Sequence, residues 1–220
     1  MTVQRWDLKA RKRIATALAQ RGLAPLLFVC VLLAAWLFNR GQSWGGALFV
    51  CACLGLPWWD AHATGGEQNV MRLRTTLSLR TDGWGLAAML AMGYLLVASW
   101  VLMREGYGPT FLPGFVQIDP LVLSRQVLMI GLLAAAEEFF FRGYLQETVG
   151  GRRWGAQGWG ILTRKNLFAA LLFGVAHLVG QPLITIPGHV LGGLALGWLV
   201  ERARGGIWPA VLLHALSNLL

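Results

Sequence analysis

Two adjacent carboxylates lie inside an apolar stretch of this sequence, and an arginine follows them at helical spacing. Glu137 and Glu138 come directly after a run of Leu and Ala, and Arg142 follows three phenylalanines. An ionisable side chain at the centre of a membrane helix costs roughly 2.5–3.5 kcal/mol, even on a lenient insertion scale. Such a cluster is therefore a candidate functional site.

Helical geometry separates the two glutamates. Residues four positions apart share one face of a helix, so Glu138 and Arg142 can form an ion pair that makes their burial tolerable. Glu137 is rotated about 100° from Glu138 and points elsewhere. The spacing predicts a structural role for Glu138 and leaves Glu137 free for chemistry.

Two more pairs with the same spacing follow, Phe173 with His177 and His214 with Asn218. Counted from the expected cytoplasmic helix ends at ~1.5 Å per residue, Glu137 and these polar side chains lie roughly 10–17 Å deep. One buried polar pocket can therefore collect all four. Taken singly, each is more often a packing or helix–helix hydrogen-bonding group. Their joint occurrence at matched depth indicates a catalytic site.

The composition defines the elements that must position these residues. Hydrophobic residues make up 56% of the 220 and charged residues only 13%, with a mean hydropathy of +0.56. Charged residues run nearer to about 25% in soluble domains, so we expect a membrane protein. The net charge of +9 comes from basic residues in short loops, and no nucleic-acid partner is expected. Cys30, Cys51 and Cys53 lie in apolar runs and are expected to be packing residues.

The sequence predicts an all-α fold, a polytopic transmembrane bundle of about 7–8 helices. Residues 1–22 are expected to form a cytoplasmic basic segment without a cleavable signal peptide, and residues 23–220 a single transmembrane domain with the motifs in 121–220. Some of the predicted spans are shorter than the ~20 residues that a span normally needs. These spans are Leu23–Phe38, Trp44–Trp59, Trp84–Met103, Leu121–Thr148, Leu167–Gly180, Leu183–Val200 and Ile207–Leu220.

Loop charge sets the orientation of membrane proteins. With the N-terminus in the cytoplasm, all of the 19 Lys and Arg residues except Arg40, Arg104 and Arg125 fall on the cytoplasmic side. The sequence therefore predicts a multi-pass protein with a cytoplasmic N-terminus and its C-terminus outside. The short chain, rich in Trp, Arg and Gly, favours a prokaryotic inner membrane.

Together the three motifs resemble those of the CPBP family, which comprises type II CAAX prenyl proteases, bacteriocin-processing enzymes and related Abi proteins. The motifs are Glu137-Glu138-x-x-x-Arg142, Phe173-x-x-x-His177 and His214-x-x-x-Asn218, with matching flanks at 140–146 and 205–210. The resemblance covers about residues 121–220, and no motif position departs from it.

The resemblance implies an intramembrane endopeptidase of the glutamate type. Glu137 would then be the general base that activates water, and His177 would help to hold and polarise that water. His214 and Asn218 would face the substrate carbonyl as oxyanion donors. The supporting residues that would brace the site are Glu138, Arg142 and Phe173. The chemistry is consistent with this, since hydrolysis needs a base and fixed donors in a dry pocket.

Metal dependence stays open in the sequence. Glu137, His177 and His214 are also a possible zinc set with an open fourth position. However, no HExxH motif is present and the three ligands would come from three helices. We therefore expect catalysis without a cofactor and keep zinc as the alternative.

Several substrates fit this reading. The partner is expected to be a membrane-anchored or lipidated protein or peptide in the bilayer: a prenylated C-terminus, a secreted peptide or bacteriocin, or a C-terminal sorting anchor. A non-catalytic scaffold or immunity protein and a proton-coupled transporter are the other classes, and the sequence leaves the oligomeric state undefined. Outside the motifs, His189 is expected to be structural, and Gly192, Gly193 and Gly197 to allow close helix approach.

Overall fold

The computed structural model describes residues 23–41, 44–79, 82–104, 120–149, 158–159 and 162–219. Helices make up nearly all of this part of the chain, together with one short antiparallel pair of strands. The predicted all-α class is thereby confirmed. The predicted basic segment, residues 1–22, lies outside the described residues.

The elements follow one another with short connections. In chain order they are the helix Leu23–Asn39, α2 Gly45–Asp60, the π-helix η1 Ala61–Gly65, α3 Gly66–Thr76, α4 Trp84–Arg104, α6 Pro120–Glu138, the π-helix η2 Phe139–Leu145, α7 Gln146–Val149, β1 Gly158–Trp159, β2 Leu162–Thr163, α9 Arg164–His177, the 3₁₀ helix η3 Leu183–Thr185, α10 Ile186–Arg202 and α11 Trp208–Leu219. Each apolar segment of the sequence overlaps one of these helices. The polar stretch after α2 continues the helical chain as η1 and α3.

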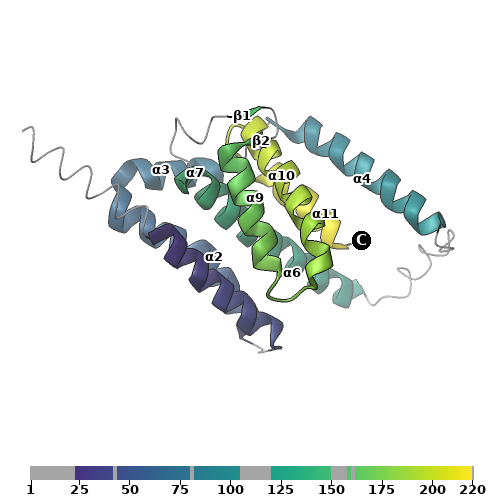
Figure 1. Ribbon diagram of the computed structural model, residues 1–220, viewed down its shortest axis with the longest axis horizontal. Coiled ribbons are helices and arrows are strands. Elements are labelled where there is room, and N and C mark those ends of the chain that lie inside the picture. Colours follow the sequence, from purple (N-terminus) through teal and green to yellow (C-terminus); the bar gives the residue numbers. More distant parts are fainter. Residues whose placement is uncertain are drawn as a thin grey trace, which may run out of the picture.

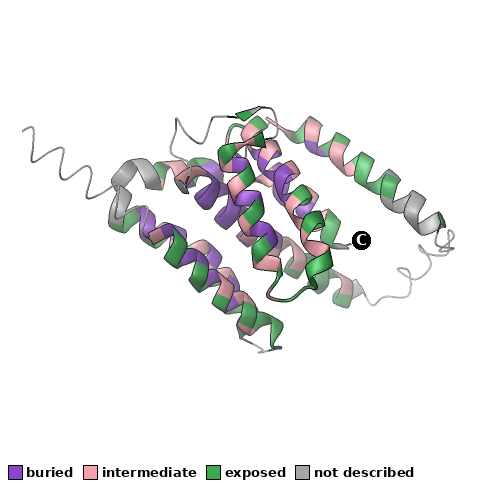
Figure 2. Cartoon of the chain, viewed as in Figure 1, coloured by how far each residue is buried: buried purple, intermediate pink, exposed green. Residues whose placement is uncertain are grey.

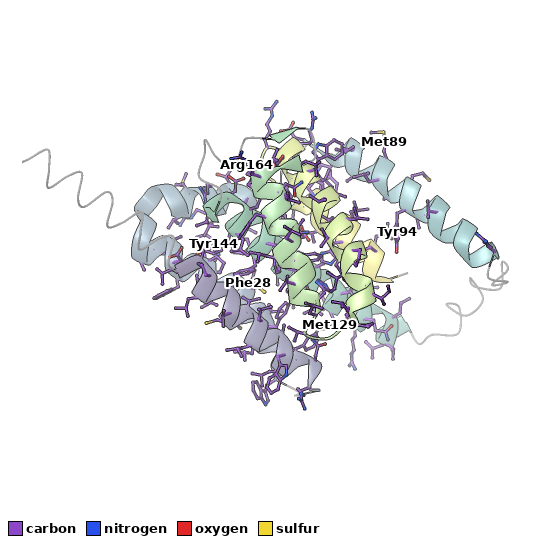
Figure 3. The ribbon with its side chains drawn as sticks, in the orientation of Figure 1. Phe28, Met89, Tyr94, Met129, Tyr144 and Arg164 are labelled. Atoms are coloured by element: carbon purple, nitrogen blue, oxygen red, sulfur yellow. The ribbon has the colours of Figure 1, made fainter. Side chains whose placement is uncertain are left out.

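The helix α6 and its continuations η2 and α7 form the centre of the molecule. α9 and α10 pack against each other beside them, while α2 and α4 lie on opposite flanks (Figure 1). α11 packs between α6 and α4. On that flank the Tyr94 hydroxyl of α4 donates to the Ser217 carbonyl of α11 at 3.4 Å (Figure 3). The three motif-bearing helices α6, α9 and α11 are thus brought into one bundle.

The π-helix η2 is the most deeply buried element that the structure describes, and all of its residues are buried (Figure 2). Its phenylalanines contact three different helices. Phe141 meets Phe28 of the helix Leu23–Asn39 at 6.2 Å and Phe173 of α9 at 5.1 Å between ring centroids, both edge-on. Phe139 stacks with Trp58 of α2 at 6.3 Å. Aromatic packing therefore fixes the position of the glutamate motif from several sides.

The start of α9 is fixed by a polar network. The Thr163 side chain caps the helix by accepting from the Asn166 N–H, and its hydroxyl donates to Glu201 at 2.7 Å. Lys165 pairs with Glu147 at 2.5 Å and with Glu201 at 3.8 Å. These contacts join α7, α9 and α10 at one end.

Small residues let α9 and α10 approach closely. A Cβ at Gly193 would lie 3.1 Å from the Ala170 backbone, and one at Gly197 would overlap the Asn166 side chain. Both glycines thus serve the close approach expected of them. Gly192 differs, because a Cβ there would meet nothing within 4 Å.

One helix of the described chain, Leu183–Arg202, is both long and apolar enough to cross a membrane. Leu23–Asn39 and Trp84–Leu95 are apolar but shorter. Many large apolar side chains of α4 and α6 face outward, among them Met89 and Leu128. The multi-pass arrangement therefore remains a prediction from the sequence, while helical architecture is established.

Candidate active site

Glu138 and Arg142 form a fully buried ion pair at the junction of α6 and η2. Arg142 Nη1 lies 3.1 Å from Glu138 Oε1, and neither side chain has any exposed surface. Arg142 Nη2 also donates to the Gly193 carbonyl of α10 at 3.3 Å. Its guanidinium lies 4.3 Å from the ring centroid of Phe173 on α9. The pair therefore joins the motif helix to α9 and α10, and both charges are compensated inside the bundle.

His214 of α11 contacts both glutamates. Its Nδ1 lies 2.9 Å from Glu138 Oε1, and its Nε2 lies 3.8 Å from Glu137 Oε2. Because a carboxylate can only accept, Nδ1–H is the donor to an ionised Glu138. The expectation for His214 was a group facing the substrate carbonyl. In the structure one nitrogen is committed to Glu138, and the other lies on the side of Glu137.

Glu137 is the less restrained of the two carboxylates. Its side chain is 18% exposed, against 0% for Glu138, and its buried Oε2 has no hydrogen-bond partner among the described residues. It lines a cavity of about 170 Å³ together with His177 of α9 and with Asn39 and Gln181. An acceptor oxygen without a donor, next to an open space, is suited to hold a water molecule.

The His177 ring is oriented by its own helix. Its Nδ1 lies 2.8 Å from the Phe173 carbonyl four residues earlier. A carbonyl accepts only, so the proton is on Nδ1, and in the neutral ring Nε2 is an acceptor. The Phe173 ring lies 4.5 Å from His177 and 5.6 Å from His214 between centroids. Phe173 thus contacts both imidazoles.

Asn218 lies away from Glu137 and His177. It is exposed on α11 and lines a second cavity, of about 430 Å³, with His214 and with residues of α4 and α10. Glu137 and His177 line the first cavity, and His214 and Asn218 line the second. The structure therefore shows two cavities, each lined by one partner of the Glu137–His214 contact, instead of the single pocket that the matched depths predicted.

Comparison with known families assigns this part of the chain. Residues 120–220 match the family model described as "Type II CAAX prenyl endopeptidase Rce1-like". This C-terminal region is therefore similar to the Rce1-like family. The resemblance drawn from the three motifs is confirmed, and the match supports peptidase activity in a family of membrane proteins. No curated protein and no solved structure matches the chain.

A metal ion in the Rce1-like region would need several donor side chains close together. No group of three or more His, Cys, Asp or Glu side chains within the described ranges is arranged to hold a metal ion. Glu137, His177 and His214, the alternative zinc set, therefore do not fit one in this arrangement.

The Rce1-like region also contains a residue pair that sequence reasoning missed. The His189 ring of α10 stacks on His177 with centroids 3.9 Å apart and planes at 19°, and its Nε2 lies 3.3 Å from Gln181 Oε1. His189 belongs to none of the motifs, which is why it was assigned a structural role. The available signal was the short connection between two apolar segments. Such a hairpin places the start of the second helix beside the end of the first.

Proposed function

We propose that this protein is an intramembrane endopeptidase in which Glu137 activates the water that hydrolyses the peptide bond. One observation carries the proposal: of two adjacent glutamates, Glu138 is fully buried and pairs with Arg142 and His214 through its Oε1, whereas Glu137 is partly exposed and lines a cavity. A carboxylate that is not held in a close ion pair is free to take a proton. General-base catalysis by such a group contributes about 10²–10⁴-fold in rate.

The water is held by two acceptors. Glu137 and the Nε2 of neutral His177 line the same cavity, so a water molecule there can donate one hydrogen to each and direct a lone pair toward the substrate. Glu137 takes a proton as the oxygen attacks the carbonyl carbon. The C–N bond then breaks, and Glu137 returns the proton to the leaving nitrogen, which restores the carboxylate.

His214 and Asn218 supply the donors for the negative charge that develops on the carbonyl oxygen. They line the second cavity together, and His214 Nε2 is 3.8 Å from Glu137. The cluster holds two carboxylates and one guanidinium, so one further proton, on Glu137 or on His214, makes it neutral. With that proton on His214, both ring nitrogens become donors.

The substrate is proposed to be a membrane-proximal or C-terminal segment of a membrane-anchored or lipidated protein or peptide. The Rce1-like match supports a CAAX-type peptidase. The bias of basic residues toward one set of loops supports a multi-pass protein with a cytoplasmic N-terminus. We place it in a prokaryotic inner membrane, where a C-terminal sorting anchor or a secreted peptide is a suitable substrate.

Purified protein in lipid nanodiscs tests the proposal. Two fluorogenic reporters are compared, a farnesylated peptide with a CAAX terminus and a peptide with an apolar C-terminal anchor. Wild type should cleave at least one of them, and Glu137→Gln should lose activity by about 10³-fold, as expected for removal of a general base. Glu147→Gln is the matched control, because it removes a carboxylate that pairs with Lys165 outside the site.

Two results would contradict the proposal. One is a folded Glu137→Gln variant that cleaves as fast as wild type. The other is proton-coupled uptake by the protein in liposomes without cleavage of either reporter, which would support the transporter class instead.

A further inference from the structure

His189 is the side chain next to His177 that the mechanism above does not use. We infer that His189 is a positioning residue: together with Gln181 it fixes the plane of the His177 ring, so that Nε2 faces the water held by Glu137. The inference rests on the proposed function for its catalytic consequence. Its geometric part, the restraint of one imidazole by another, rests on a ring stacking and a hydrogen bond.

The contacts form a closed circuit around His177. Its backbone carbonyl accepts from the Gln181 N–H at 2.9 Å. The Gln181 side-chain oxygen then lies 3.3 Å from His189 Nε2, which is therefore the donor. The His189 ring in turn stacks on the His177 ring at 3.9 Å. Gln181 and His189 thus link the backbone of His177 to the face of its own ring.

This restraint complements the one from within α9. The hydrogen bond from Nδ1 to the Phe173 carbonyl holds one edge of the ring, but a single hydrogen bond still allows the ring to tilt about it. A near-parallel aromatic neighbour at 19° limits that tilt. Since the water is bound by the opposite nitrogen, a tilt of the ring displaces the atom that matters for chemistry. A displacement of about 1 Å in a reacting group can cost about 10²-fold in rate.

Core packing does not account for a histidine at this position. His189 is only partly buried, and its neighbours Pro187 and Gly188 are exposed at the start of α10. Its polar contacts go to Gln181, which is exposed too. A residue whose role was to fill the core would not be placed at this exposed end. His189 also lines the cavity of His214, while His177 lines that of Glu137, so the stacked pair stands between the two cavities.

The kinetic test uses four variants in nanodiscs with the reporter that wild type cleaves. His189→Ala should lower kcat by about tenfold or more and leave KM within about twofold, because substrate binding is intact and only alignment is lost. His189→Phe keeps a flat stacking ring and should retain kcat within about threefold. Gln181→Ala should fall between them. Leu191→Ala, an exposed side chain on the same helix, should match wild type.

A double-mutant cycle separates positioning from a general loss of structure. If His189 acts only through His177, His189→Ala in a His177→Ala background should lower kcat no further. A purely structural role would make the two losses multiply. Multiplying losses, or a His189→Ala variant as active as Leu191→Ala, would overturn the inference while leaving the peptidase proposal intact.

A readout without catalysis covers the case in which the peptidase proposal itself fails. Diethylpyrocarbonate acylates neutral imidazole nitrogens, and mass spectrometry gives the rate at His177. His189→Ala should raise that rate by about fivefold or more over wild type and over Leu191→Ala, because the stacked ring covers one face of His177. Equal rates in all three proteins would overturn the inference whatever the activity.

Discussion

The two glutamates are neighbours in the chain, yet their surroundings are opposite. The Glu138 side chain is completely buried, with Arg142 at 3.1 Å and His214 at 2.9 Å. The Glu137 side chain is partly exposed, faces a cavity and has only the longer 3.8 Å contact with His214. The helix turns by about 100° between them, which is enough to put one on the packed face and the other on the open face.

On the mechanism that we propose, this difference explains how a buried helical bundle can keep a reactive carboxylate. An isolated charge in an apolar interior is costly, so most buried carboxylates must be paired. Here Glu138 forms the ion pair with Arg142, and His214 lies near Glu137. Glu137 therefore gains a stabilising neighbour without being held in a close ion pair.

The sharpest way to break this comparison is to remove each carboxylate in turn. Glu138→Ala should lower the free energy of unfolding by about 3–5 kcal/mol, because it leaves the buried Arg142 charge unpaired. Glu137→Ala should leave stability within about 0.5 kcal/mol of wild type while abolishing cleavage. Thermal or denaturant unfolding in detergent micelles measures both.

A double variant sharpens the same point. Glu138→Leu with Arg142→Leu removes both charges together, and it should lose less stability than Glu138→Leu alone. An equal or larger loss in the double variant would mean that the ion pair is not what makes Glu138 structural.

The next largest effect is expected at His214, which contacts both Glu138 and Glu137. His214→Ala should lower kcat by about 10²–10³-fold, because it removes both a donor and the partner of Glu138. Asn218→Ala should lower kcat less, by about tenfold, because Asn218 is exposed, whereas His214 is buried against Glu138. Steady-state kinetics with one reporter compares them. A larger loss of kcat for Asn218→Ala than for His214→Ala would mean that Asn218, and not His214, is the main donor to the oxyanion.

Two glycines on α10 also differ in being packed or open, and a smaller effect on stability is expected from replacing them. Gly197→Ala puts a Cβ against the Asn166 side chain on the packed face, so it should cost about 1–3 kcal/mol of stability. Gly192→Ala is the matched control, because its Cβ would meet open space. Equal unfolding midpoints for the two variants would show that the packed face of α10 is not tight.

The smallest expected effect is that of metal removal. Exhaustive chelation of the purified protein should leave cleavage within about twofold of the untreated enzyme, since the side chains near Glu137 do not fit a metal ion. Loss of activity that added zinc restores would assign Glu137, His177 and His214 to the zinc-dependent form of the same reaction.

The sequence could predict those features that depend on helical spacing. The i, i+4 rule gave the pairs Glu138–Arg142 and Phe173–His177 as same-face neighbours, and hydropathy gave helices where the structure has them. The family followed from three motifs in order and is confirmed. Depth along a helix was a weaker guide, because it contains no information on which way a face points. It therefore grouped Asn218 with Glu137 and His177, although Asn218 lines a different cavity from the other two.

Contacts between helices needed the structure. His214 Nδ1 meets Glu138 across two helices, and His189 meets His177 only because η3 and the preceding turn bring α10 back beside α9. The i, i+4 rule indicates neither contact, and only the short connection between the two apolar segments was a signal for the second. The glycines show the same limit, since Gly192 and Gly193 are adjacent in sequence but only Gly193 is pressed against α9.

The carboxylate cluster takes its imidazole from α11, which a ribosome makes after α6, α9 and α10. Until α11 reaches α6, Glu138 has its arginine, but Glu137 lacks the His214 imidazole. If the proposed mechanism holds, a nascent chain therefore carries an incomplete centre without its donors for a substrate oxygen. Packing of α11 against α6 would then complete the fold and the active site in one event, so a half-translated copy would not cut the proteins around it.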